Sequence, residues 1–372
     1  MFHEHTSNSL RIARSLGLLS LGLISSSCGH TQAAPAPAAT DTVMKTIQDY
    51  GRDHHGLLAP GNSAKPDESA DLYSAHIKTL FAQEDFAQLE QIAKQERINK
   101  GRLLGGIWKI KSFYDSVRVP VFTGELTDAD YARQIARVKK WIAAYPDSTT
   151  ANLSLAFVYL SYASFARGSG FADSVSDSQW SLFHSRSDQA KAILLEASTL
   201  KDKDPAWYEA MQLVAHDEGW DKVRARELFD QATAFEPDYY HYYRRYADYL
   251  LPQWYGEPGD IRAFAEEISN RIPEPNGSML YFQIVSSLAC YCEESLRELP
   301  HVSYPIARQG YTNVTRFYGA SNLNANRFAF MASMFKDQVA AREAFAALSS
   351  MDSEIWYKEE VFNSSRDWAN AH

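Results

Sequence analysis

The side chains best suited to acid–base or metal chemistry in this sequence do not have the spacing that would bring them together. His216, Asp217 and Glu218 are consecutive. Successive residues of a helix diverge by about 100°, so these three cannot converge on one metal or substrate, and we interpret them as polar residues of a turn. His54 and His55 are adjacent in "GRDHHG" without a further ligand at helical spacing. The sequence therefore predicts no metal site and no cofactor.

The segment "ARGSGFADSV" contains Gly168, Ser169 and Gly170 but fits neither glycine-rich catalytic motif. A phosphate-binding loop needs a following Lys-Ser or Lys-Thr, and a nucleophile elbow needs Gly-x-Ser-x-Gly. We interpret Gly168 as the residue that ends a helix at Arg167. The loop 168–180 remains a candidate recognition feature. No catalytic residue is assigned, and the sequence predicts a protein that is not an enzyme.

An unusual run of tyrosines follows Pro237 and has the spacing of one helix face. Steps of three and four predict a buried aromatic stripe on a helix over residues 239–251. Buried tyrosines need partners for their hydroxyl groups, and nearby Asp and Arg side chains are the expected partners. The stripe consists of Tyr239, Tyr242, Tyr243, Tyr246 and Tyr249 or Leu250.

The opposite side of the same predicted helix is polar. Tyr240, Arg244 and Asp248 share this side, and His241 and Arg245 flank it. First helices of helical repeats line the concave surface of an array. We therefore predict that Tyr240, His241, Arg244 and Arg245 face a binding partner.

The segment "QWYGEPGD" predicts a fixed turn after this helix. An aromatic anchor, two glycines with unusual backbone angles and a stiffening proline are typical of such turns. Exposed aromatic rings also suit sugar rings, so carbohydrate stacking on Trp254 or Tyr255 is an alternative. The motif consists of Trp254, Tyr255, Gly256, Pro258, Gly259 and Asp260.

These residues must be positioned by helices, because strand patterns are scarce and helix-capping signals recur. Thr127 with Asp130 predicts a capping box. Ser148 is placed to cap the next helix, and Asp204 followed by Pro205 gives a cap and a proline at the first helical position. Asp260 begins another predicted helix. The fold class expected from these signals is all-α.

A short motif recurs in three of the predicted helices. "AKAILLEA" and "ARELFDQA" are 35 residues apart, and "AREAFAAL" has the same internal spacing. Small residues let a neighbouring helix approach closely, and a large apolar residue fills the groove between them. The positions concerned are Ala190, Leu194 and Ala197; Ala225, Phe229 and Ala232; and Ala341, Phe345 and Leu348.

This spacing, with Pro237 five residues after the second copy, resembles the second helix of tetratricopeptide repeats. The order of the blocks "GIWKIKSFYDSV", "DPAWYEAM", "YLLPQWYGEPGD" and "YGASNLNANRFAF" resembles the uncharacterised bacterial domain-of-unknown-function family 4034. That resemblance runs from about Trp108 to Trp368 and implies a helical, tetratricopeptide-like fold with no established activity. The expected architecture is a right-handed α-solenoid of degenerate repeats.

Two cysteines, Cys290 and Cys292, lie within a segment that the pattern predicts to be one helix from Ser278 to about residue 299. Residues two apart on a helix point to nearly opposite sides. We therefore expect these cysteines to act as small apolar residues and not to form a disulfide.

The N-terminus has the features of an export signal. Arg11 and Arg14 precede the apolar stretch 16–24, and "LISSSC" resembles the lipobox of bacterial lipoproteins, in which Cys28 would be lipidated. Ser25 departs from that pattern, and cleavage near Ala38 to release a soluble periplasmic protein is the alternative. We expect a signal peptide at 1–27, an Ala/Pro-rich tether at 28–44, an N-terminal helical segment at 45–120, either separate or made of irregular repeats, and a repeat domain at 121–372.

The formal net charge of -9 argues against a nucleic-acid partner, because phosphate backbones are bound by basic surfaces. The sequence therefore predicts an exported, periplasmic protein, anchored in the outer membrane only through a lipid at Cys28. Its expected role is a scaffold that binds a protein or peptide in the cell envelope. The alternatives are a cell-wall-active enzyme or a carbohydrate-binding protein with a cleft in the helical array.

Overall fold

The expectation of an all-α protein is confirmed. The computed structural model describes residues 37–52, 68–168, 172–290 and 292–371. Within these ranges every regular element is helical, and the only strand-like pairing is an isolated antiparallel bridge between Arg102 and Trp108. Among the described residues, no helix combines the length and the apolar content needed to cross a membrane.

Eighteen α-helices and four short 3-10 helices follow one another in the described part of the chain. They are α1 (Pro37–Arg52), α2 (Ala70–Ala82), α3 (Phe86–Asn99), η1 (Leu104–Gly106), α4 (Lys109–Arg118), α5 (Asp128–Ala144), α6 (Thr149–Arg167), η2 (Ala172–Ser174), α7 (Asp177–Ala197), α8 (Pro205–Asp217), α9 (Lys222–Phe235), α10 (His241–Tyr249), α11 (Asp260–Arg271), α12 (Asn276–Val285), η3 (Ser286–Leu288), α13 (Glu293–Glu298), η4 (Leu299–His301), α14 (Tyr304–Tyr318), α15 (Asn322–Met334), α16 (Gln338–Ala346), α17 (Ser353–Trp356) and α18 (Glu359–Asn370).

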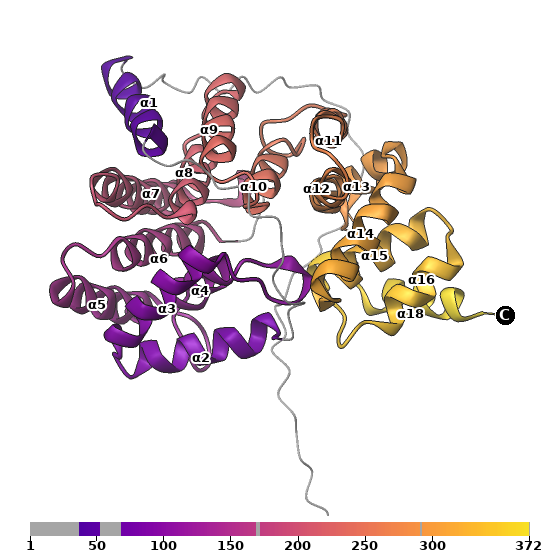
Figure 1. Cartoon of the computed structure of the whole chain (residues 1–372), viewed down its shortest axis with the longest axis horizontal. Helices are drawn as coiled ribbons and strands as arrows, with labels where there is room; N and C mark the ends of the chain where they lie inside the picture. Colours follow the sequence, from indigo (N-terminus) through magenta and orange to yellow (C-terminus); the bar gives the residue numbers. More distant parts are fainter. Residues whose placement is uncertain (1–36, 53–67, 169–171, 291, 372) are drawn as a thin grey trace, which may run out of the picture.

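Helices that are neighbours in the sequence are mostly neighbours in space. α6 packs against α5 and α7, α8 packs against α7 and α9, and α12 packs between α11 and α14. Figure 1 shows the resulting arc, which runs from α2 and α5 through α10 to α14 and α18. This arrangement is consistent with a helical-repeat array. The right-handed superhelix remains a prediction.

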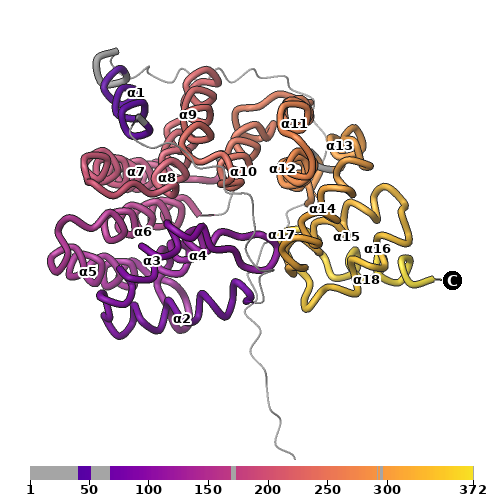
Figure 2. The backbone as a smooth tube through the Cα atoms, in the orientation of Figure 1, coloured from indigo at the N-terminus to yellow at the C-terminus, as the bar shows by residue number. Residues whose placement is uncertain are grey.

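One segment between α3 and α4 crosses from the first part of the arc to its last part (Figures 1 and 2). The Asn324 side-chain amide of α15 donates to the Gly105 carbonyl at 3.1 Å. Gly105 has a φ of +78°, and a Cβ there would lie 2.3 Å from the Ser321 hydroxyl oxygen. We call residues 100–108 the closing segment, because its contacts with α14 and α15 join the two ends of the arc.

The local sequence signals are confirmed where they concern helix starts, and most of the repeat-motif positions are buried, although Leu348 is only partly so. Thr127 and Asp130 form the predicted capping box, and Ser148 and Asp204 cap α6 and α8 with their side chains. Gly168 ends α6 as expected. α11 starts at Asp260, although its cap residue makes no side-chain hydrogen bond. Of the repeat-motif positions, Ala190, Leu194, Ala197, Ala225, Phe229, Ala232, Ala341 and Phe345 are buried.

A single hydrophobic core extends from Ile47 to Ala369 and crosses the domain boundary expected at residues 120 and 121. α1 belongs to this core, because the Tyr50 ring stacks on Trp207 at 4.1 Å between centroids. The expectation of an extended tether to residue 44 is wrong in its last part, because α1 begins at Pro37. The predicted signal peptide and Cys28 lie outside the described residues.

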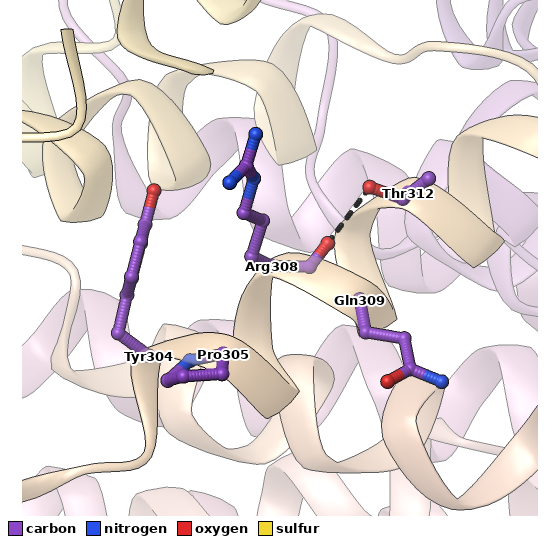
Figure 3. Close-up of a pocket in the computed structure, with 5 residues that line it drawn as sticks. All are labelled: Tyr304, Pro305, Arg308, Gln309 and Thr312. Atoms are coloured by element: carbon purple, nitrogen blue, oxygen red, sulfur yellow. Dashed lines mark hydrogen bonds between the residues drawn. The ribbon is translucent and has the colours of Figure 1, made fainter. Parts of the chain in front are cut away.

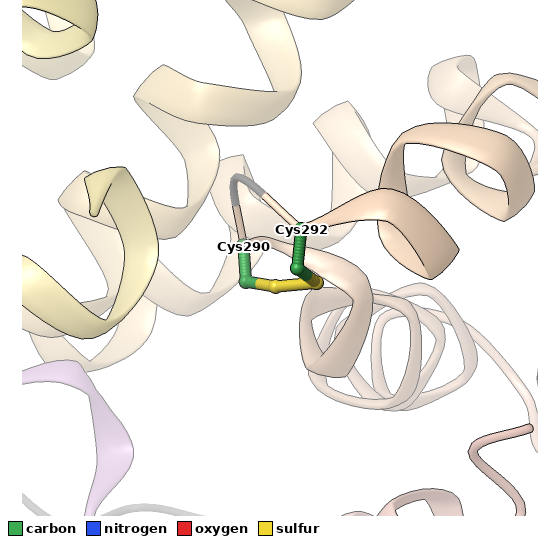
Figure 4. The surroundings of a disulfide bond; sticks show 2 residues. All are labelled: Cys290 and Cys292. Atoms are coloured by element: carbon green, nitrogen blue, oxygen red, sulfur yellow. A yellow bond between two sulfur atoms is a disulfide. The ribbon is translucent and has the colours of Figure 1, made fainter. Parts of the chain in front are cut away.

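The single helix expected from Ser278 is also wrong. α12 ends at Val285, η3 follows, and α13 begins at Glu293. Cys290 and Cys292 form a disulfide in the intervening turn (Figure 4). The argument against this bond assumed helical geometry. Because the chain leaves the helix before Cys290, the two side chains are free to point to the same side.

Candidate functional site

The tyrosine stripe is confirmed as core. The five tyrosines and Leu250 are all buried. Their hydroxyl partners differ from those expected. Tyr239 donates to the Glu209 carboxylate at 2.7 Å, whereas Tyr242, Tyr243 and Tyr249 donate to backbone carbonyls of Pro205, Pro237 and Trp220 at 2.7, 3.2 and 2.6 Å. The stripe thus fixes α10 against α8 and α9 and turns its polar side inwards.

The polar side of α10 does not form an open surface. His241 is only 7% exposed, and Tyr240, Arg244 and Arg245 are half-buried. Their charged neighbours include Lys111 of α4 and Glu209 of α8. The predicted partner-facing residues therefore lie together, but at an enclosed position between helices. That these four residues face a binding partner remains a prediction.

Two residues of the polar side are held by fixed partners. The Arg244 guanidinium donates to the Gln283 carbonyl and the Ser286 hydroxyl at 3.1 and 2.9 Å. The Arg245 guanidinium donates to the buried Glu209 carboxylate at 3.2 Å. Arg245 is therefore chiefly structural, because it neutralises a carboxylate that has no exposed surface.

The site includes two arginines that the sequence analysis missed. Arg102 belongs to the closing segment and Arg327 to α15, and both act electrostatically on the Tyr240 hydroxyl. Arg102 stacks over the Trp108 ring, with its guanidinium carbon 3.5 Å from the ring centroid. No hydrogen bond or ion pair of Arg327 is found among the described residues. No local motif marks either residue, because the fold alone brings them to α10.

Several cationic side chains from different parts of the chain lie around α10. We call Arg102, Lys111, Arg244, Arg245 and Arg327 the inner cationic cluster. The carboxylates that act on its members are Glu209, Asp115, Asp248, Glu236, Asp238 and Asp352, of which the first two also pair with Lys111. Burial, together with the neighbouring Arg244, lowers the pKa of Arg327 to about 9. The cluster thus concentrates cations in an otherwise acidic protein.

His241 is an unsatisfied polar group within this cluster. Its Nε2 atom is buried without a hydrogen-bond partner. Burial and the charges of Lys111, Arg244, Arg245 and Arg102 hold the pKa of His241 well below its usual range, so the imidazole is neutral near pH 7. A buried nitrogen without a partner is costly.

The turn after α10 is confirmed as a structural motif, with different roles for its members. Tyr255 is the anchor, because its hydroxyl donates to the His216 carbonyl at 2.7 Å. Trp254 is 40% exposed, but the Arg167 guanidinium lies over its ring at 5.5 Å. Gly256 is required by close approach, since a Cβ would lie 1.8 Å from the Leu250 carbonyl oxygen.

The remaining residues of the turn fix the start of α11. Gly259 has the expected positive φ of +91°. The Asp260 carboxylate accepts from the Glu257 backbone amide at 2.8 Å and from Lys222 at 2.8 Å. Pro258 is exposed beside these contacts. Trp254 stays partly exposed beside Arg167, and carbohydrate stacking on its ring remains a prediction.

Two pockets open elsewhere on the molecule. The first, of about 380 Å³, lies along α14 and is lined by Tyr304, Pro305, Arg308, Gln309 and Thr312 (Figure 3). Two of its polar groups are already engaged, because the Tyr304 hydroxyl and Arg308 both bind the Asp337 carboxylate at 2.9 and 3.2 Å. The second, of about 340 Å³, is mainly apolar and lies between α15 and α18. Neither holds a group of catalytic side chains.

In the part of the chain that is described, no three His, Cys, Asp or Glu side chains lie close enough to share a metal ion. No family model, curated protein or solved structure matches the chain. The resemblance to family 4034 therefore depends on the sequence blocks alone, and the site is interpreted from its own geometry.

Proposed function

We propose that this protein is an exported, lipid-anchored helical-repeat scaffold that binds an acidic segment of a protein or peptide partner in the cell envelope. The observation that carries the proposal is the inner cationic cluster beside α10. Its arginines come from the closing segment, α10 and α15, so the surface exists only in the folded array. Family 4034 membership and the outer-membrane, periplasmic location are parts of the same proposal.

The charge distribution supports an acidic partner. The whole chain has a net charge of -9, so most of its surface repels an acidic segment at long range. The cluster offers the opposite sign at one enclosed position. Complementary charge at a single place favours one binding register over others. Charge-assisted hydrogen bonds to partly buried guanidinium groups are also stronger than exposed surface ion pairs.

A binding role fits this geometry better than catalysis. The buried carboxylate of the site, Glu209, is engaged by Tyr239, Arg245 and Lys111. It therefore has no free position from which to act as a general base or nucleophile. The side chains of the inner cationic cluster supply hydrogen-bond donors for a ligand, as a binding scaffold requires.

The proposal is tested by recovery of partners from native envelope extracts. The double variant Arg102→Gln/Arg327→Gln removes two cluster charges, and Arg262→Gln removes one exposed charge from α11 as the matched control. We expect the double variant to lose the partners that the wild-type protein and the control retain. Retention of every partner by a correctly folded double variant would contradict the proposal.

The anchoring part of the proposal has its own test. Cys28→Ala removes the only acceptor for a lipid in the predicted lipobox. We expect the variant to move from the membrane fraction to the soluble periplasmic fraction. A Ser27→Ala variant, which keeps the cysteine, is the control. Unchanged fractionation of Cys28→Ala would contradict lipid anchoring without affecting the binding proposal.

A further inference from the structure

A cavity of about 340 Å³ opens between the end of α15, the turn that follows it, and α18. α18 packs chiefly on α16 and only in part on α15, so a space is left between α15 and α18. Phe330 of α15 and Trp356 of α17 are buried at this cavity, whereas Trp368 of α18 is half-buried. Met334 and Val361 add further apolar lining. The volume is within the range of cavities that take up small organic molecules.

One charged side chain is found among the described residues that line the cavity. It is the exposed Lys336, in the turn after α15, and its amine lies 5.5 Å from the centroid of the Trp368 ring. An ammonium group has three N–H donors, so contact with a ring leaves most of them available to an acceptor. The remaining polar lining consists of the hydroxyl groups of Ser333, Ser364 and Ser365. The cavity thus joins ring-lined walls to a single cation.

The backbone of Lys336 is in the left-handed region, with a φ of +59°, where glycine is favoured. Two other charged residues in the described part of the chain share this conformation, and each has an oppositely charged partner. Glu84 accepts from Lys140 at 2.8 Å, and Lys100 forms an ion pair with Glu236 at 2.8 Å. For Lys336, no ion pair is found among the described residues. Its amine therefore differs from theirs in having no carboxylate to bind.

The carboxylates in this part of the fold are engaged elsewhere or lie outside the cavity. Asp337 follows Lys336 in the sequence, but its carboxylate accepts from the Tyr304 hydroxyl at 2.9 Å and pairs with Arg308 at 3.2 Å, both on α14. The carboxylates of α18 are exposed and do not line the cavity; they belong to Glu359, Glu360 and Asp367. A ligand that brings its own negative charge would thus complement Lys336.

We propose that this cavity binds a small aromatic carboxylate, with the ring of the ligand among Phe330, Trp356 and Trp368 and its carboxylate at Lys336. Burial of a ring in an apolar cavity is favourable, and the edges and faces of aromatic rings attract one another. The carboxylate supplies the charge that complements the amine. The site shares no residue with the inner cationic cluster and goes beyond the proposed function.

The experiment is calorimetric titration of the purified full chain with phenylpropionate, its uncharged amide, acetate, and a short peptide with a free C-terminal phenylalanine. We expect phenylpropionate to bind about threefold or more tightly than the amide, because an exposed ion pair adds a modest free energy. Acetate has the charge without the ring. We therefore expect no measurable binding of acetate, since the apolar contribution is lost.

Lys336→Gln removes the charge, and we expect it to lower the affinity for phenylpropionate to that for the amide while leaving the amide unchanged. Lys358→Gln is the matched control, because Lys358 is an exposed lysine at the start of α18 that does not line the cavity. Lys336→Gly separates binding from folding. Glycine suits the left-handed conformation, so we expect the urea midpoint to stay close to that of the wild type while the preference for the acid is lost.

The outcomes separate this inference from the proposed function. Absence of binding of the acid, the amide and the peptide overturns the cavity as a ligand site. Equal affinity of the wild type and Lys336→Gln for phenylpropionate, or tighter binding of the amide than of the acid, overturns a carboxylate ligand. Binding of the peptide without binding of the free acid overturns a small-molecule ligand and assigns the cavity to a chain terminus. The inner cationic cluster is tested independently, by recovery of envelope partners.

Discussion

At the scale of single residues, the tyrosines show how aromatic side chains position a polar site. Each ring of the buried stripe packs against helices on one side of α10, while most hydroxyl groups end on backbone carbonyls. The position of α10 is thereby fixed, and Tyr240, His241 and Arg244 are left on the side facing the closing segment. The stripe therefore positions the polar side chains of α10 indirectly, by fixing the helix that carries them.

Tyr239→Phe tests the one stripe hydroxyl that is bound to a charge. The change removes a hydrogen bond to the buried Glu209 carboxylate, which still keeps Arg245. We expect the free energy of unfolding to fall by about 1.5 to 3 kcal/mol, measured by urea denaturation. Tyr246→Phe on the same helix is the control, because no hydrogen bond to its hydroxyl is found among the described residues. Equal losses in both variants would contradict this account.

His241 makes the stability of the protein depend on pH. The unfolded state takes up a proton as the pH falls through about 6.5, whereas the folded state does not, because the pKa of His241 is well below its usual value. The free energy of unfolding therefore decreases with falling pH, and His241→Gln removes this part of the decrease. Denaturation at about pH 7 and about pH 5 measures it.

The exposed His184 provides the comparison, since His184→Gln leaves the buried imidazole in place. A His241→Gln variant with the same pH dependence as the wild type would show that the imidazole is protonated when folded.

At the scale of elements, local signals in the sequence predicted where helices start and which sides are buried. The capping box at Thr127 and the proline at the start of α8 act over a few residues, so their effect is readable from the sequence. The break after Val285 was missed, because the apolar pattern continues through η3 and no local breaker residue marks the end of the helix.

Gly105→Ala tests the closing segment. Alanine there meets the Ser321 hydroxyl at 2.3 Å and must adopt a positive φ. We expect a loss of about 1 to 3 kcal/mol in the free energy of unfolding and faster hydrogen exchange in α14 and α15.

Gly124→Ala is the matched control. It has a φ of +81° but no atom within 4 Å of its added Cβ, so it measures the backbone strain alone. Equal losses in the free energy of unfolding of both variants, together with equal hydrogen exchange in α14, would show that the approach of Gly105 to Ser321 contributes nothing to stability.

At the scale of the whole molecule, the sequence predicted the helical class but not the contacts between segments that are distant in sequence, such as the closing segment and α15. Arg102 and Arg327 belong to no common motif, and their approach to Tyr240 depends on the curvature of the complete array. The hydrophobic core continues on both sides of residue 120, and whether residues 45–120 form a separate unit or irregular repeats remains a prediction.

A continuous core predicts cooperative unfolding across that boundary. We expect hydrogen exchange in α5 and in α16 to show the same urea midpoint, because closure couples the two ends of the arc. Fluorescence of the whole chain should follow one transition. Long helical arrays without closure often lose such cooperativity. Two separate midpoints, with α16 unfolding first, would show that the ends are independent despite the closing segment.

The contacts of the closing segment also determine the order in which parts of the fold form. The bond between Asn324 and Gly105 joins residues 219 positions apart in sequence, whereas most helix pairs form from neighbouring stretches of chain. Contacts between distant residues carry a large loop-closure cost and tend to form late in folding. A chain that emerges from its N-terminus therefore completes the inner cationic cluster only after α15, which contributes Arg327, has emerged. Binding of the proposed partner would therefore require that the chain has folded as far as α15.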